Sequence, residues 1–346
     1  MCAIMRPFLL NLVGVIGILT LSACTGERGG GLDGELWCYD GGLSIKRLSG
    51  GSSKAFEVLT ALTGAGASGS IQDFAVSKDG HAWLAASDGK LYRFSTETGD
   101  LEATVSVGTD AKKVAAFGSY VYAHTDESSE LKLVRVNPTN NSTTPYSWGA
   151  SNYDPDTVKF DSSEHVYGLS RNPFHLLRLD AATAGSALDK EVQSTYGYGD
   201  FAISGDSVWV VNGFDDKINR LSLSSLATDG DFGFALPFSL DNTLWVEASS
   251  DRLAILSRDS KKLFTIPQSV AAASDYTETD LSDLPSLKDA VGDGESIAVV
   301  ASSSERNIHV YSISDGQEIG TIDTQASLDS ALSSITIGAT YCDLAD

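Results

Sequence analysis

A short pattern of alternating apolar and polar residues recurs at nearly constant spacing along the chain. It consists of an apolar residue, a variable residue, an arginine and a second apolar residue, as in Leu91-Tyr92-Arg93-Phe94. The last two copies keep the apolar positions but lack the arginine, and successive copies lie 42 to 47 residues apart. A constant period of this length indicates an architecture built from repeated units. The copies occupy residues 45–48, 91–94, 133–136, 176–179, 218–221, 263–266 and 310–313.

A second apolar segment precedes each of the last six copies, mostly just after a polar turn. Lys78-Asp79-Gly80, for example, comes directly before the segment 81–85. β-Branched and aromatic residues between turns rich in Gly, Asp and Ser are typical of short antiparallel strands. The longest insertion, residues 268–287, is predicted to be a loop between repeats. We therefore predict an all-β fold at residues 35–346, a seven-bladed β-propeller of four-stranded antiparallel blades.

The repeat resembles those of bacterial and archaeal propellers with Tyr-Val-Thr-Asn repeats, and of quinoprotein-dehydrogenase-like propellers in general. The closest segment is Val208–Gly213 followed by Lys217–Leu221. The resemblance covers almost the whole chain after its first two dozen residues, but it concerns architecture. Tryptophan-aspartate repeats fit less well, because no copy combines a Gly-His opening with a Trp-Asp ending.

The first two dozen residues are similar to the export signal of bacterial lipoproteins. Arg6 precedes an apolar stretch from Phe8 to Leu21, too short for a membrane span but typical of a secretory signal. The stretch ends in Leu21-Ser22-Ala23-Cys24, which resembles the lipobox of that family. The resemblance implies that residues 1–23 are removed and that Cys24 carries lipid. An ordinary cleaved signal with an incidental cysteine is the alternative.

The residues after Cys24 are expected to form a flexible tether. Residues 24–34 are polar and rich in glycine, a composition typical of flexible linkers. Thr25 follows the cysteine, where aspartate would be the usual signal for retention in the inner membrane. The resemblance to lipoproteins therefore implies a protein that lipid anchors in the bacterial cell envelope, at the outer membrane.

The two ends of the chain are predicted to meet in one shared blade that closes the ring. Residues 36–39 and 45–48 would supply two strands of this blade, and residues 334–337 its inner strand. Cys38 and Cys342 would then lie on neighbouring strands, where a disulfide is geometrically feasible. Export to an oxidising compartment favours that bond. Two unpaired buried thiols are the alternative.

The charge of the chain narrows the choice of partner. There are 24 Lys and Arg against 46 Asp and Glu, which gives a formal net charge of −22. Binding to nucleic acid requires a basic surface, so nucleic acid is excluded as an expected partner. Electrostatic docking on anionic lipid head groups is disfavoured for the same reason.

The recurring arginines are the most regular candidate residues. A ring of positive charge for an anionic ligand is one interpretation. The other is structural: the aliphatic stem covers the neighbouring sheet and the guanidinium pairs with a carboxylate. A residue that recurs in nearly every repeat usually has a structural role that every repeat shares. This favours the structural interpretation. The residues are Arg47, Arg93, Arg135, Arg178 and Arg220.

Other chemistry has weaker support in the sequence. The five histidines have no short metal-ligand spacing, and no CxxCH motif for haem occurs. Asp215-Asp216 and Asp229-Gly230-Asp231 offer oxygen ligands, but neither extends to a calcium loop. No Gly-x-Ser-x-Gly motif marks a serine hydrolase. We therefore predict neither a metal nor a cofactor, and we assign no catalytic residue.

Two classes of function remain. The first is a non-catalytic binding or scaffolding lipoprotein that presents the faces of the propeller to an envelope protein or a polymer. The second is an envelope enzyme, such as a metal-dependent lactonase or a quinone-cofactor dehydrogenase. Propellers host both classes, so the fold alone does not decide between them. The absence of a catalytic motif favours the first.

Lipidation of Cys24 can be tested directly. Replacement of Cys24 with Ala should release the protein from the membrane fraction and abolish its labelling by a fatty-acid analogue, because the thiol is the attachment point that the lipobox implies. Fractionation with and without the substitution measures the first effect. Unchanged fractionation and labelling would refute the prediction.

Overall fold

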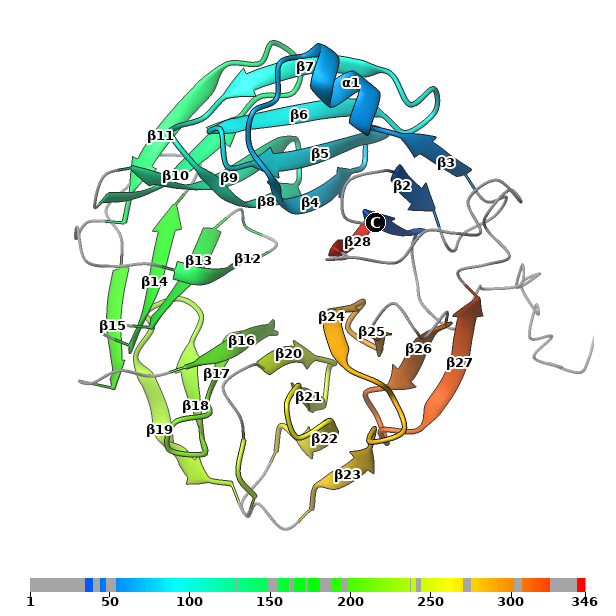
Figure 1. The fold of residues 1–346 in the computed structure, drawn as a ribbon. Coiled ribbons are helices and arrows are strands. Elements are labelled where there is room, and N and C mark those ends of the chain that lie inside the picture. Colours follow the sequence, from blue (N-terminus) through cyan, green and yellow to red (C-terminus); the bar gives the residue numbers. More distant parts are fainter. Residues whose placement is uncertain are drawn as a thin grey trace, which may run out of the picture.

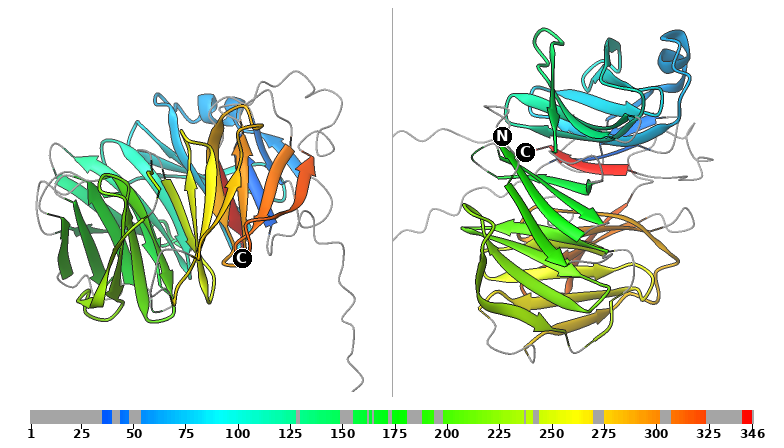
Figure 2. Two further views of the ribbon diagram at one scale, coloured as in Figure 1. Left: turned by 90° about the horizontal axis from the view of Figure 1, so that it is seen from below. Right: turned by 90° about the vertical axis from the view of Figure 1, so that its left-hand side faces the viewer.

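The chain folds into a ring of seven β-sheets. The computed structural model describes residues 35–39, 44–47, 54–127, 130–148, 155–161, 163, 165–171, 174–180, 188–193, 198–236, 238–240, 244–269, 275–301, 307–323 and 341–345. Each sheet has four strands, all paired antiparallel. Figure 1 shows the sheets arranged as blades around a central axis, and Figure 2 shows the same ring from two further sides. The predicted seven-bladed propeller is confirmed. The predicted signal peptide, Cys24 and the predicted tether lie outside the described residues.

The first three complete blades follow one another around the ring, each running from the axis to the rim in chain order. They consist of β4 (Ile71–Ser77), β5 (His81–Ala86), β6 (Lys90–Ser95) and β7 (Leu101–Ser106); β8 (Ala111–Phe117), β9 (Tyr120–Glu127), β10 (Glu130–Val136) and β11 (Thr143–Ser147); and β12 (Pro155–Phe160), β13 (His165–Arg171), β14 (Phe174–Asp180) and β15 (Leu188–Gln193).

Three more complete blades continue the same order. They consist of β16 (Gly199–Ser204), β17 (Ser207–Asn212), β18 (Lys217–Ser222) and β19 (Thr228–Ala235); β20 (Leu244–Ala248), β21 (Arg252–Ser257), β22 (Lys262–Pro267) and β23 (Thr277–Asp280); and β24 (Leu287–Gly292), β25 (Ser296–Ala301), β26 (Asn307–Ser312) and β27 (Glu318–Asp323).

The seventh blade combines the two ends of the chain, as predicted. Its order is β28 (Tyr341–Ala345), β1 (Glu35–Tyr39), β2 (Ser44–Arg47) and β3 (Lys54–Glu57), with β28 at the axis. The strand predicted for the inner position, residues 334–337, lies outside the described residues, and the strand that pairs with β1 comes a few residues later. The register places Cys38 directly opposite Cys342.

Two elements differ from the sequence-based expectation. The insertion at residues 268–287 contains β23, the rim strand of its blade. Its residues are alternately half-buried and exposed. A strand at the rim of a blade packs against few apolar side chains, so its sequence has no apolar alternation. The short helix α1 (Leu59–Gly64) joins β3 to β4. At six residues it is too short to show helical periodicity.

The hydrophobic core lies between neighbouring blades rather than at the axis. One cluster joins Trp209 and Val211 of β17 to Ile255 and Phe264 of the next blade, and all four are almost completely buried. The alternation of each strand supplies one apolar face to each neighbour, so every blade depends on the two beside it. In the part of the chain that the structure describes, no helix is both long and apolar enough to cross a membrane.

The closed blade yields a prediction about the two cysteines. Residues directly opposite each other on antiparallel strands have Cα atoms about 4.5–5.5 Å apart, which a disulfide can span. We expect a non-reduced digest to contain the Cys38 and Cys342 peptides linked, as measured by mass spectrometry. Cys38→Ser should lower the free energy of unfolding by about 2–4 kcal/mol.

The double variant provides the control. Cys38→Ser and Cys342→Ser combined should destabilise the protein no more than either single substitution, because each one alone already removes the same bond. Free thiols at both positions in protein isolated from an oxidising compartment would contradict the pairing.

Candidate functional site

An axial cavity of about 480 Å³ lies where the inner strands converge. Its described wall comes from six blades, mainly from β4, β8, β12, β16, β20 and β24, the strands nearest the axis in Figure 1. Charged side chains from these separate blades meet in it. They are Asp73, Lys113, Lys159, Asp200 and Glu247. The repeat thus gathers at one place charged groups that the sequence keeps roughly one period apart.

Two of these carboxylates connect the inner strands of neighbouring blades. Oδ2 of Asp73 accepts the backbone N–H of Val114 at 2.9 Å, and Oδ2 of Asp200 accepts that of Val246 at 2.7 Å. In each case the donor lies on the inner strand of the next blade. Burial raises the pKa of Asp73, although Lys113 and the backbone N–H groups favour its charged form. Both aspartates therefore have a structural part in closing the ring.

Lys159 extends this contact across three blades. Its ammonium lies 3.3 Å from Oδ2 of Asp200 and donates to the carbonyl of Val246 at 2.7 Å. Glu247 follows, and burial raises the pKa of its carboxyl group despite the attraction of Lys159. A Cβ atom at position 292 would lie 2.4 Å from Cγ of Glu247, so a larger residue there would require the Glu247 side chain to move.

His124 is the buried polar residue of the cavity wall. Its side chain is 3% exposed, and its Nε2 atom has no hydrogen-bond partner. It lies directly opposite Lys113 in the pairing of β8 with β9. Burial, together with the charges of Lys113 and Lys112, lowers the pKa of His124 to about 4. The imidazole is therefore neutral at pH 7.

The recurring arginines lie beside aromatic residues of the neighbouring strand in the same blade. Each is the cross-strand partner of an aromatic residue at the matching place of its repeat. In three blades the guanidinium lies over the face of that ring, at 5.3 to 5.9 Å from the centroid. The pairs are Trp37–Arg47, Trp83–Arg93, Tyr122–Arg135, Tyr167–Arg178 and Trp209–Arg220.

Some of these arginines also reach the next blade. Arg93 donates to the carbonyl of Pro138, and Arg178 donates to the carbonyls of Leu223 and Ser224. All three carbonyls belong to the turn or connection between the third and fourth strands of the next blade. The acceptors in these contacts are backbone carbonyls, whereas the structural interpretation expected a carboxylate; Arg93 also has one, Glu102, at 3.3 Å. The arginines lie away from the residues that line the axial cavity.

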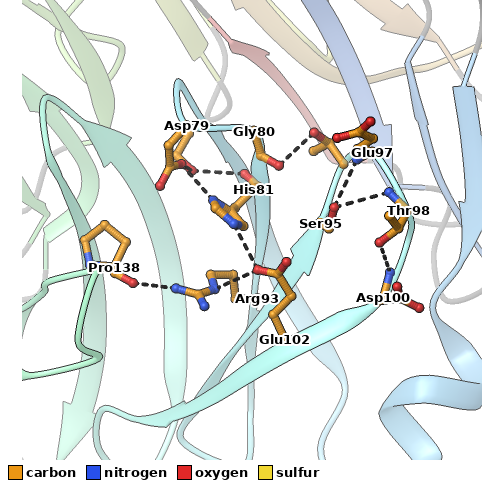
Figure 3. A network of polar contacts seen from close by, with 12 residues as sticks. Asp79, Gly80, His81, Arg93, Ser95, Glu97, Thr98, Asp100, Glu102 and Pro138 are labelled. Carbon is orange, nitrogen blue, oxygen red and sulfur yellow. Dashed lines mark hydrogen bonds and ion pairs between the residues drawn. The ribbon is translucent and has the colours of Figure 1, made fainter.

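A polar network at the edge of one blade illustrates how the remaining histidines are held. Figure 3 shows His81 between two carboxylates, with Nδ1 3.0 Å from Asp79 and Nε2 2.9 Å from Glu102. Arg93 contacts the same Glu102 oxygen at 3.3 Å. Burial alone would raise the pKa of Asp79, but hydrogen bonds from Ser77 and His81 hold it below its usual value.

Every histidine except His124 pairs with a carboxylate in this way. The pairs join a ring nitrogen to a carboxylate oxygen at 2.6 to 3.0 Å, and they belong to three blades. Within the described residues, no group of three potential ligands could hold a metal ion. The pairs are His81 with Asp79 and Glu102, His165 with Asp161, His175 with Asp189, and His309 with Glu318.

The sequence interpretation did not single out the axial residues. The alignment of repeats used the second and third strands of each blade, whereas Asp73, Lys113 and Asp200 lie on first strands. Each is the second or third residue of its strand. Lys113 follows Asp73 by 40 residues and Asp200 follows Lys113 by 87, close to one and two periods. An alignment of the first strands would therefore have identified them as neighbours at the axis.

Comparison with known proteins identifies the fold. No family model matches the sequence, and no curated protein matches it. A streptogramin B lyase structure is 14% identical over 72% of this chain and 82% of its own, with a TM-score of 0.56. BamB from Moraxella catarrhalis is 15% identical over 86% of this chain and 85% of its own, with a TM-score of 0.54.

A designed protein gives a similar result. The computationally designed Ika8 is 13% identical over 86% of this chain and 90% of its own, with a TM-score of 0.58. The similar structures thus include an enzyme, a bacterial protein and a design without natural history. At these identities they show that the chain is a β-propeller, and they show no function.

The neutral state of His124 leads to a prediction about acid stability. Its pKa is about 4 in the folded protein and about 6.5 in the unfolded chain. The unfolded chain therefore binds the extra proton first, and the free energy of unfolding should fall as the pH drops from about 6.5 to about 4. The loss from this residue is about 3 kcal/mol, and it is complete below about pH 4.

Urea unfolding at a series of pH values measures this effect. His124→Gln keeps a polar side chain that does not titrate, so its unfolding free energy should depend less on pH by up to about 1.4 kcal/mol per pH unit. His309→Gln serves as the control, since His309 is paired with the carboxylate of Glu318 at 2.8 Å. An unchanged pH dependence in His124→Gln would disprove the assignment.

Proposed function

We propose that this protein is a lipid-anchored component of the bacterial envelope that binds another envelope protein through one face of its propeller and catalyses no reaction. The lipobox-like segment at Cys24 and the glycine-rich tether support the anchor. The closed ring supports a rigid binding surface, because its inner strands are fastened to one another by Asp73, Asp200 and Lys159.

The observation that carries the proposal is an exposed aromatic side chain on a tightly held turn. Phe214 is 55% exposed, and no other large apolar side chain among the described residues is exposed to that extent. The ring of Tyr198 packs edge-on against it, with centroids 6.2 Å apart at 83°. Large aromatic side chains contribute much of the binding energy in protein interfaces. Phe214 is therefore the expected centre of the docking surface.

Hydrogen bonds fix the turn that carries Phe214. The backbone N–H of Phe214 donates to Oδ1 of Asn212 at 3.0 Å, and that of Gly213 donates to the carbonyl of Tyr198 at 2.8 Å. Asp216 accepts the N–H of Leu240 at 2.7 Å. A preordered surface loses little conformational entropy on binding. The rigidity of this turn therefore supports its use as a docking surface.

The position of the turn suits an anchored protein. β1 and β17 are both second strands of their sheets, so in a ring of repeated blades both begin on one face and end on the other. The chain enters the propeller at Glu35, at the start of β1, whereas Phe214 follows the end of β17. Phe214 therefore lies on the face of the propeller opposite the entry of the chain at Glu35. On our proposal this is the face that docks the partner.

An envelope enzyme is the alternative class. Such an enzyme would use the axial cavity, where Lys159 and Glu247 lie close to each other. The carboxylates of Asp73 and Asp200 already accept backbone N–H groups of the next blade, which supports a structural use of the axis. Turnover of a lactone or an alcohol by the purified protein, lost on addition of a chelator, would overturn the proposal.

Substitution of Phe214 tests the docking surface. In intact cells, Phe214→Ser should reduce co-purification of the cross-linked envelope partner by at least about tenfold, because a central aromatic contact is worth more than about 1.4 kcal/mol. Ile319→Ser is the matched control. Ile319 is 48% exposed but lies on the rim strand β27, so its loss should leave co-purification unchanged. Equal effects of the two substitutions, or no effect of either, would contradict the assignment.

A further inference from the structure

One carboxylate in the wall of the axial cavity keeps an oxygen atom without a partner. Glu247 lies on β20 and lines the cavity. Its Oε1 accepts the backbone N–H of Ala248 at 3.2 Å, whereas its Oε2 has no hydrogen bond or ion pair among the described residues. Oε2 is not fully buried, so a molecule in the cavity can reach it.

Other carboxylates on the inner strands show which contact Glu247 lacks. Asp200 accepts the N–H of Phe201 with Oδ1, and the N–H of Val246 on the next blade with Oδ2, both at 2.7 Å. Asp73 likewise accepts the N–H of the residue that follows it and one N–H of the next blade. Glu247 makes the first of these contacts and not the second. Its second oxygen is therefore available to a ligand.

The inner strand of the next blade leaves room for this carboxylate. Gly292 is the last residue of β24, which lies beside the axis with β20 in Figure 1. A Cβ atom at position 292 would lie 2.9 Å from Oε2 of Glu247. A larger residue there would require the carboxylate to move. The present position of the free oxygen therefore depends on the absence of a side chain at position 292.

The charges around Glu247 favour a cation at Oε2. Three carboxylates and two lysines line the described wall of the cavity, a formal net charge of −1. Lys159 attracts Glu247, but its ammonium lies 3.3 Å from Oδ2 of Asp200. The other lysine of the wall, Lys113, acts on the carboxylate of a different blade. Asp200 and Asp293 add negative charge near Glu247.

The titration of Glu247 agrees with a missing counter-charge. Burial raises the pKa of its carboxyl group, and the negative charges of Asp200 and Asp293 raise it further. An opposite charge within about 4–6 Å favours the ionised form of a carboxyl group. A cation bound at Oε2 would thus stabilise the carboxylate and would itself be held by it.

An aromatic side chain lies beside this carboxylate. Trp245 precedes Glu247 by two residues on β20, so both side chains lie on one face of the sheet, and both line the cavity. Trp245 is half-buried against apolar residues of the next blade. Tryptophan is the aromatic residue that attracts cations most strongly. The volume of the cavity, about 480 Å³, falls within the range of small-molecule sites.

We propose that the axial cavity binds a small organic amine, with its ammonium group at Oε2 of Glu247 and its apolar body against Trp245. One free carboxylate oxygen suits an ammonium group better than a metal ion, since no group of three potential metal ligands occurs in the described part of the chain. The site is separate from the Phe214 surface and does not depend on the docking of a macromolecule.

Fluorine NMR with para-fluorobenzylamine as the probe tests this site. We expect the purified full chain to bind para-fluorobenzylamine at pH values near 7. Its neutral analogue para-fluorobenzyl alcohol has the same shape and should bind at least about tenfold more weakly, because only the ammonium group forms a charge-assisted hydrogen bond with the carboxylate. Equal binding of the alcohol, or no binding of the amine, would each overturn the proposal.

Two acidic residues provide a matched pair of variants. Glu247→Gln keeps the acceptor for the N–H of Ala248 but removes the charge, and it should weaken binding of para-fluorobenzylamine at least about tenfold. Asp293→Asn also removes a negative charge near the site, but Asp293 is not part of the described cavity lining. The asparagine oxygen can still accept the N–H groups of Glu295 and Ser296, which Oδ1 of Asp293 accepts.

The two variants separate a local contact from a general electrostatic effect. Asp293→Asn should change the affinity for para-fluorobenzylamine less than about threefold, because the charge that it removes makes no contact with the ligand. Equal losses in the two variants would indicate long-range electrostatics without a site, and would overturn the proposal.

The two proposals fail independently. Phe214→Ser should leave the affinity for para-fluorobenzylamine unchanged, since Phe214 lies outside the described cavity lining. Glu247→Gln should leave co-purification of the envelope partner unchanged. Burial disfavours the charged form of Glu247, so the neutral glutamine is not expected to unfold the protein, and urea unfolding checks this. A loss of amine binding in Phe214→Ser would contradict the separation of the two sites.

Discussion

Closure of the ring is the constraint on which every other part of this structure depends. Each blade buries its two faces against neighbours, and an open ring would leave two apolar faces in water. The pairing of β28 with β1 removes those faces by joining the last strand of the chain to the first, over five register pairs. The axial cavity, the fixed turns and the position of the chain entry all follow from a ring that has closed.

Two kinds of contact reinforce closure of the ring, one near the axis and one farther out in the blades. Near the axis, carboxylates of one inner strand accept N–H groups of the next, and Lys159 spans three blades. Farther out, an arginine lies beside an aromatic residue of its own blade, and in two described cases it donates to carbonyls of the next blade. The outer contact repeats with the sequence period, whereas the inner contact varies from blade to blade. Variation at the axis is what gives the cavity its mixture of charged and aromatic side chains.

Much of this architecture was predictable because each second and third strand has an apolar face that repeats. The shared blade followed from the same reasoning, since a ring must join its ends. The rim strand β23 was missed because Thr277–Asp280 has no apolar alternation. The inner strand was predicted at residues 334–337, while the strand that pairs with β1 is Tyr341–Ala345.

The candidate sites were harder to predict for a different reason. The sequence shows five histidines of equal standing, and only the fold reveals that four have carboxylate partners and that His124 has none. Phe214 lies in a turn, and the exposure of its side chain cannot be read from the sequence of that turn. Each carboxylate partner lies within the blade of its histidine, but which side chains meet depends on the strand register and on burial, which the sequence pattern does not contain. The arginines, by contrast, were recognisable because their partner lies on the adjacent strand.

The placement of β1 has a mechanical consequence. β1 is an interior strand of its sheet, hydrogen-bonded to β28 on one side and to β2 on the other. A pull that enters at Glu35 acts along the strand, so the hydrogen bonds of both ladders carry the load together in shear rather than opening one after another. On the proposed lipid anchor, tension between the membrane and a partner bound on the opposite face would enter the ring through this strand. The first strand of the chain is thus built to transmit force without unzipping the ring.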